Sequence, residues 1–167
     1  MVTQFTFYMP KFMMKYIPGS IYYNTFLSNI ADSVSTFMSF WFYKYMGGKA
    51  TLATCFTIAT LTSIPLIFIN DTDPAFDTAW IPLIIFSMSF GVAAAVANLY
   101  VSHMDNFPVV FNTTTFAFCG SMGQFATVFA PLVAEVSHPV PQLSFTLMSA
   151  VAIFATLLIR PKTSQFY

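Results

Sequence analysis

Long apolar segments alternate with short polar breaks along almost the whole chain. The apolar segments cover residues 19–43, 50–69, 79–102, 112–136 and 143–159. A helix that crosses the hydrocarbon of a bilayer needs about 20 mostly apolar residues. Uniform apolar runs of this length favour helices over barrel strands, which would alternate in hydrophobicity over about ten residues. The pattern therefore predicts an all-α integral membrane bundle with five full transmembrane helices.

The N-terminal segment does not fit this series. Residues 1–16 are apolar and aromatic but carry Lys11 and Lys15, and the segment is too short to cross a membrane alone. We expect a partial or interfacial helix here. The bundle itself is expected over residues 17–163, with a tail at 164–167.

Composition agrees with a membrane protein. The 167 residues are 57% hydrophobic and only 7% charged, whereas a soluble domain is about 25% charged. Six basic and six acidic residues give a formal net charge of zero, so no basic field is present to bind nucleic acid. An aromatic content of 19% excludes a disordered chain. Lipid is thus the first expected partner.

The placement of Lys and Arg predicts an orientation. With five crossings, the 44–49 turn, the 103–111 connection and the C-terminus lie on one side of the membrane. That side carries Lys44, Lys49, Arg160 and Lys162, and the other side carries Lys11 and Lys15. The positive-inside rule then places the C-terminus in the cytoplasm, or in the matrix of a mitochondrion. A plasma membrane and a mitochondrial inner membrane are not distinguished.

Asp32 is the most informative single residue, because a carboxylate near the middle of a span costs several kcal/mol unless it faces a partner or a polar cavity. One interpretation is ion or proton coupling, or a charge pair that holds one conformation. The alternative is a helix-interface residue bonded to Ser28, Ser33 or Ser35. Both interpretations stay open on the sequence alone.

The fourth apolar segment carries signs of an interrupted helix. Pro131 lies near one end, and Gly120 and Gly123 lie toward the other. Helix breaks of this kind line cavities in transporters, but a kink with small residues at a helix contact explains them as well. Gln124 lies between them as a neutral donor and acceptor, and Asn24 has the same character in the first segment.

Signs of enzymatic chemistry are missing. Cys55 and Cys119 lie in apolar runs away from any pair of histidines, which predicts two small buried side chains rather than a disulfide or metal site. No nucleophile–base pair and no Gly-rich phosphate cradle is recognisable. We expect no enzyme, no cofactor and no bound metal.

The order of the breaks resembles the C-terminal half of a major facilitator superfamily carrier, in particular the organic cation/anion transporter family. Residues 18–32 look like the start of that family's eighth helix, Gly-x-x-Tyr-x-Asn-x-x-Leu-Ser, with Asp32 in place of its closing Glu. Further matches lie at the cytoplasmic Asp-Arg-x-Gly-Arg-Arg turn, the Tyr-x-x-x-x-Glu-Leu-Tyr/Phe-Pro motif, the eleventh helix and the Leu-Pro-Glu-Thr end of the twelfth. In this chain they are Gly47 with Lys49; Tyr100, Asp105, Phe107 and Pro108; Phe111 through Ala130-Pro131; and Arg160-Pro161-Lys162-Thr163. The resemblance covers about residues 12–163 and rests on joint order and spacing rather than on one strong motif.

The chain also departs from the family pattern. Tyr43 replaces the acid of the cytoplasmic turn, and Asn112 stands where the family has an Arg. Gln124 occupies the position that is acidic in cation carriers and basic in anion carriers. A preference for cations or anions therefore does not carry over.

The resemblance implies transport of an organic solute by alternating access, with the chain as one half of the carrier. Gln124, Asn24 and Tyr22 would line the cavity, and Asp32, Lys49 and Asp105 would form a gating charge network. One half has no second wall, so a partner is implied: the missing N-terminal half, a second copy or a larger membrane assembly.

Two alternatives remain. The eroded charge positions fit a transport-inactive half-transporter kept as a structural accessory subunit of a large membrane complex, such as a respiratory-chain complex. The chain would also look like this if it were the ordered part of a longer carrier.

Overall fold

The computed structural model describes residues 2–15, 21–68, 74–106, 108–136 and 140–158. Every regular element within those ranges is an α-helix. In chain order the helices are α1 (Val2–Met13), α2 (Ile21–Met46), α3 (Gly48–Phe68), α4 (Pro74–Asn106), α5 (Val109–Thr127), α6 (Phe129–Ala134) and α7 (Val140–Leu158). The predicted tail at 164–167 lies outside the described residues.

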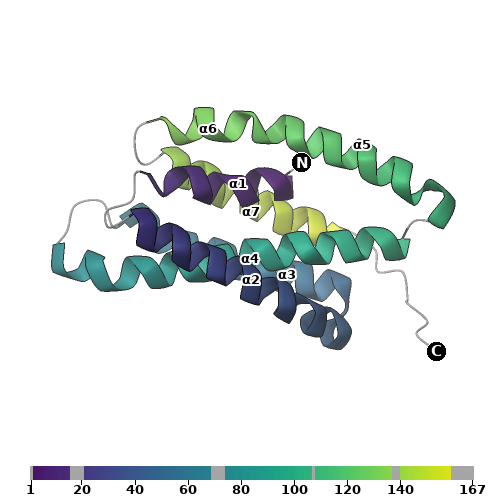
Figure 1. Cartoon of the computed structure of the whole chain (residues 1–167), viewed down its shortest axis with the longest axis horizontal. Helices are drawn as coiled ribbons and strands as arrows, with labels where there is room; N and C mark the ends of the chain where they lie inside the picture. The colour runs from purple at the N-terminus through teal and green to yellow at the C-terminus, as the bar shows by residue number, and fades with distance from the viewer. Residues whose placement is uncertain (1, 16–20, 69–73, 107, 137–139, 159–167) are drawn as a thin grey trace.

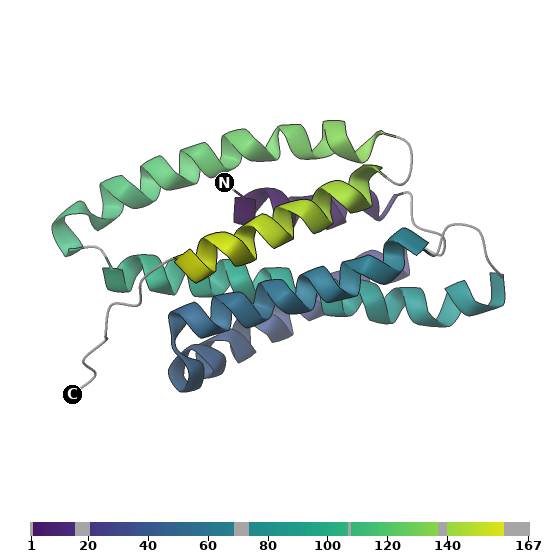
Figure 2. The same cartoon turned by 180° about the vertical axis from the view of Figure 1, so that it is seen from behind.

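The helices run back and forth between two ends of the molecule (Figures 1 and 2). The α2–α3 and α4–α5 connections and the end of α7 lie at one end. The ends of α1, α3 and α6 lie at the other end, as does the start of α7 (Figure 1). This up-and-down order agrees with the sequence prediction that the 44–49 turn and the 103–111 connection share a side.

Four helical stretches in the described part of the chain are long and apolar enough to cross a membrane. They are Gly48–Ile67, Trp80–Asp105, Val110–Ala134 and Val140–Leu158. The remaining predicted span, residues 19–43, corresponds to α2, which has 26 residues but is not among these four. Because α2 carries many Ser, Thr and Asn residues besides Asp32, its hydropathy is lower. A membrane bundle is therefore supported, whereas the count of five spans is not confirmed.

The core forms where α1 and α4 meet the other helices. α4 packs against α1, α2 and α3, and α1 packs against α4, α5, α6 and α7. Phe5, Met9, Ile85, Met88 and Phe145 are buried at these contacts. The segment predicted as a partial or interfacial helix is thus a central element of the bundle.

Small residues let α3 and α4 approach closely. A Cβ on Gly91 would lie 2.9 Å from the Cys55 carbonyl oxygen and 3.1 Å from the Ala59 nitrogen. Ala94 and Ala95 are fully buried on the same helix. Close backbone approach of this kind is a common way to pack helices in a membrane, where apolar side chains gain little by leaving lipid.

The break predicted near Pro131 coincides with the junction of α5 and α6. α5 ends at Thr127, and α6 begins at Phe129 after Val128. Proline has no N–H, so Pro131 cannot bond the carbonyl of Thr127, and its ring crowds that carbonyl. The interruption one turn before Pro131 follows from this missing bond.

Candidate functional site: a polar face with an ion pair between two helices

α2 presents three distinct faces along its length. The buried face carries small or polar residues at spacings of three and four: Asn24, Ser28, Ala31, Ser35 and Ser39. A second face is exposed and apolar: Tyr23, Phe26, Ile30, Val34, Phe37 and Trp41. The third, which we call the polar stripe, carries Tyr22, Thr25, Asn29, Asp32, Ser33 and Thr36 and is exposed except at the half-buried Asp32. An apolar exposed face suits lipid, whereas a polar stripe needs another environment.

The buried face of α2 is joined to α4 by hydroxyl groups. The Ser28 and Ser89 hydroxyl oxygens lie 2.9 Å apart, and the Ser39 hydroxyl donates to the Ala94 carbonyl at 3.5 Å. Asn24 is also buried there, 2% exposed, and its Nδ2 has no hydrogen-bond partner. Hydrogen bonds of this type hold helices together in an apolar environment. Asn24 thus lies in the α2–α4 contact rather than on the polar stripe.

Asp32 forms an ion pair with α1. Its Oδ2 lies 2.9 Å from the Nζ of Lys11, whose ammonium also lies 4.2 Å from the centre of the Phe7 ring. The Asp32 side chain is 19% exposed and the Lys11 side chain is 35% exposed. The ammonium is attracted both by the carboxylate and by the negative face of the aromatic ring, so the two charges are compensated locally.

The hydroxyl groups near Asp32 donate to backbone carbonyl oxygens rather than to its carboxylate. Ser35 and Thr36 donate to the Asp32 carbonyl oxygen, each at 2.8 Å, and Ser33 donates to the Asn29 carbonyl at 3.0 Å. Ser28 bonds Ser89. The expectation that neighbouring serines hold the Asp32 carboxylate is therefore not met, since helical hydroxyls bond the carbonyl three or four residues back.

Lys11 is the residue that sequence reasoning missed as the partner of Asp32. The sequence predicts a partial or interfacial helix over residues 1–16, separate from the first long span, and it does not show how close Lys11 comes to a residue of that span. One signal was available: Gln4, Tyr8 and Lys11 recur at spacings of four and three on one helix face. An unpaired mid-span acid also demands a cation.

The same face of α1 continues toward α4 and α5. Gln4 Nε2 donates to the Tyr100 hydroxyl at 2.8 Å. A Cβ on Gly123 would lie 2.9 Å from the Gln4 Cγ, so the glycine lets α5 approach α1 closely. α1 therefore contacts α2 through the Lys11–Asp32 ion pair and α5 through Gln4.

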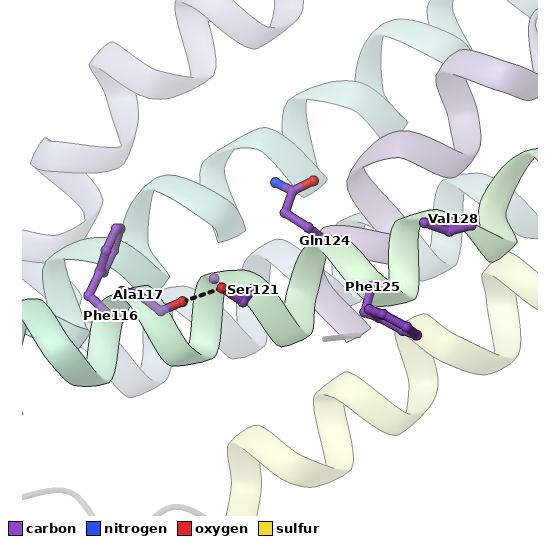
Figure 3. A pocket seen from close by; sticks show the side chains of 7 residues that line it. Phe116, Ala117, Ser121, Gln124, Phe125 and Val128 are labelled. Atoms are coloured by element: carbon purple, nitrogen blue, oxygen red, sulfur yellow. Dashed lines mark hydrogen bonds between the residues drawn. The ribbon is translucent and has the colours of Figure 1, made fainter.

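An open hollow of about 580 Å³ lies along α5. Its lining residues are Phe116, Ala117, Gly120, Ser121, Gln124, Phe125 and Val128. Gln124 and Phe125 project to opposite sides of the helix in Figure 3, and the Ser121 hydroxyl is turned back to the Ala117 carbonyl, 2.9 Å away. The hollow is formed by one helix and its neighbouring residue Val128, so it has only one wall.

The three predicted cavity residues are not gathered in one place. Asn24 is buried between α2 and α4, Tyr22 is 89% exposed at the start of α2, and Gln124 lies in the hollow of α5. A cavity that contained all three would need Asn24 to turn outward.

The three predicted gating residues also have separate partners. Asp32 pairs with Lys11, whereas Asp105 accepts a hydrogen bond from the Tyr43 hydroxyl. Lys49 donates to the Leu157 carbonyl at 2.7 Å. Tyr43, Asp105 and Lys49 lie at the end where α2 and α4 finish and α3 begins, and Asp32 lies near the middle of α2. These contacts tie α2 to α4 and α3 to α7 at that end without forming one network.

The described residues contain no group of three His, Cys, Asp or Glu side chains that could hold a metal ion. Cys55 is buried as expected, whereas Cys119 is exposed, because it lies on the outer surface of α5. The arrangement pairs two opposite charges across two helices and leaves polar groups exposed for a ligand or partner.

Comparisons with known proteins give no family for the chain. No protein-family model matches it, and no curated protein matches it either.

Proposed function

We propose that the chain is one half of a membrane carrier for an organic solute, and that its polar face lines the solute pathway. The proposal is carried by one observation: the polar stripe of α2, whose Asp32 pairs with Lys11 of α1, is left uncovered by the described helices. Polar groups at membrane depth require water, a ligand or a second polar surface.

The packing supports this proposal in a second way. α3 and α7 cover one side of the bundle (Figure 2), and α1 and α2 lie on the other (Figure 1). Carriers bind solutes near the midplane, between two such bundles that rock against each other. A second bundle, either an N-terminal half or another copy of this chain, would complete the pathway across α1 and α2.

Cysteine labelling tests the pathway without knowledge of the solute. In a Cys119→Ser background, Ser33→Cys tests the polar stripe and Val34→Cys, about 100° further round the same helix, tests the apolar exposed face. Thiols react with charged methanethiosulfonates as thiolates, which need water. We expect Ser33→Cys to react at least tenfold faster in membranes. Equal rates would show that the stripe faces lipid or a protein contact.

Solute uptake by proteoliposomes then tests transport itself. The wild type should accumulate solute, whereas Asp32→Asn and Gln124→Ala should alter the flux. Unchanged flux in both variants would remove these residues from the pathway.

A second function has support from the charged contacts. Asp32, Asp105 and Lys49 each have a partner within the chain, which suits a static bundle as well as a moving one. The chain would then be a structural accessory subunit of a larger membrane complex. Stoichiometric co-purification with other membrane subunits, together with slow labelling of Ser33→Cys, would favour this function over transport.

A further inference from the structure

We infer that the Lys11–Asp32 site takes a small zwitterion, a ligand that carries both an ammonium and a carboxylate. This inference deepens the proposed function, because it names the chemical class of the solute. It rests on the charge balance, exposure and position of the ion pair.

The site as it stands is electrically neutral. The Lys11 ammonium and the Asp32 carboxylate are in direct contact at 2.9 Å. A singly charged ligand that displaced either group would leave one charge uncompensated at membrane depth, which costs several kcal/mol. A zwitterion avoids this cost, because its carboxylate pairs with Lys11 while its ammonium pairs with Asp32.

The pair is accessible from the polar face. Lys11 is 35% exposed and Asp32 is 19% exposed, so neither charge is sealed in the core. Asp32 is followed along α2 by the exposed polar residues Ser33 and Thr36. A ligand can therefore reach the contact without unpacking a helix.

The ion pair can open while its two helices stay in place. Lys11 belongs to α1 and Asp32 to α2. A second contact, from the Thr25 hydroxyl to the Met14 sulfur at 3.7 Å, still joins the same two regions when the ion pair is open. The lysine side chain has four rotatable methylenes, so its ammonium can withdraw from Asp32 while the helix stays in place. The Phe7 ring remains beside the ammonium and contributes to holding it.

Three ligands with the same four-carbon skeleton test the inference. Purified full-length chain in nanodiscs of neutral phospholipid is titrated calorimetrically with γ-aminobutyrate, butylamine and butyrate. We expect γ-aminobutyrate to bind at least tenfold more tightly than either singly charged ligand. Equal affinities for the three ligands, or no binding of γ-aminobutyrate, would overturn the inference.

Single neutralisations should reverse the preference. Lys11→Met leaves the carboxylate and should favour butylamine, whereas Asp32→Asn leaves the ammonium and should favour butyrate. The exchange Lys11→Asp with Asp32→Lys keeps the pair and should bind γ-aminobutyrate within threefold of the wild type. Lys44→Met and Glu135→Gln, whose side chains lie at the two ends of the bundle, should leave all three affinities unchanged.

The wild-type titrations decide the ligand class even if a variant fails to fold. Failure of the carrier proposal is distinguishable, because it is measured by labelling at Ser33→Cys and by flux. If Ser33→Cys is labelled rapidly but γ-aminobutyrate is not preferred, only the zwitterion inference is rejected. If γ-aminobutyrate is preferred but neither rapid labelling nor flux is found, only the carrier proposal is rejected.

Discussion

Gly91 of α4 lies against Ala59 of α3, so close that a Cβ on the glycine would be 3.3 Å from the alanine Cβ and 2.9 Å from the Cys55 carbonyl oxygen. The nearest atoms belong to the backbone of α3, which cannot rotate away as a long side chain can. The α3–α4 contact therefore depends on the absence of a single methyl group.

Gly91→Ala should destabilise the bundle by about 2 kcal/mol, because overpacking of a tight contact forces the helices apart. Chemical denaturation in detergent micelles, followed by circular dichroism, measures this change. Gly120 is a matched control, since no atom lies within 4 Å of its Cβ position. Gly120→Ala should leave stability unchanged or raise it by up to about 1 kcal/mol, because alanine favours the helix. Equal losses in both variants would contradict the close α3–α4 contact.

The Lys11–Asp32 pair should show strong coupling in a double-mutant cycle. Asp32→Asn alone and Lys11→Met alone each leave an uncompensated charge, and each should cost roughly 2 kcal/mol of unfolding free energy. The double variant should cost much less than the sum of the two, because no charge remains unpaired. Denaturation midpoints of the four proteins provide the measurement. Additive losses would mean that the two residues do not interact in the membrane.

Much of the helical pattern could be predicted from the sequence, but not every element. Uniform apolar runs located the helices that became α3, α4, α5 with α6, and α7. α2 is harder to classify, because its residues lie in three environments: Ser28 and Ser39 contact α4, Phe37 is exposed, and Asp32 and Ser33 lie on the polar stripe. A hydropathy average over such a helix falls although its length suits a span.

The candidate site was predicted less well, because it depends on contacts between distant segments. The cost of an isolated charge marked Asp32 as unusual, and that argument holds without any structure. Its partner Lys11 lies 21 residues away on a separate helix, so only the folded structure identifies it. Asn24 shows a different difficulty: polarity alone does not tell whether an amide faces a cavity or a neighbouring helix, and in the structure this side chain is buried.

The Tyr43–Asp105 hydrogen bond should hold the end of α4 rather than the whole bundle. Both groups are at least partly exposed, so Tyr43→Phe should cost only about 0.5–1 kcal/mol. Amide hydrogen exchange should become faster in the last turn of α4, because the side-chain contact that fastens it to α2 is lost. Tyr45→Phe, which alters an exposed hydroxyl on the same turn of helix, is the control and should leave exchange unchanged. Uniformly faster exchange across all helices would show that the bond supports the core.

The alternation of the helices predicts which exposed positions share a side of the membrane. The end of α2 and the end of α4 lie together, whereas Lys15 and Glu135 lie at the opposite end of the bundle. In a Cys119→Ser background, Lys44→Cys and Asp105→Cys should react with an impermeant maleimide from one side of sealed vesicles. Lys15→Cys and Glu135→Cys should react from the other side. If all four positions react from the same side, α2 does not cross the membrane in the direction that its packing requires.

The positive-inside rule makes a further commitment, because Lys44 and Lys49 lie at the first of these ends. Lys44→Cys should therefore react only after the membrane is opened, in vesicles whose lumen corresponds to the cytoplasm or the matrix.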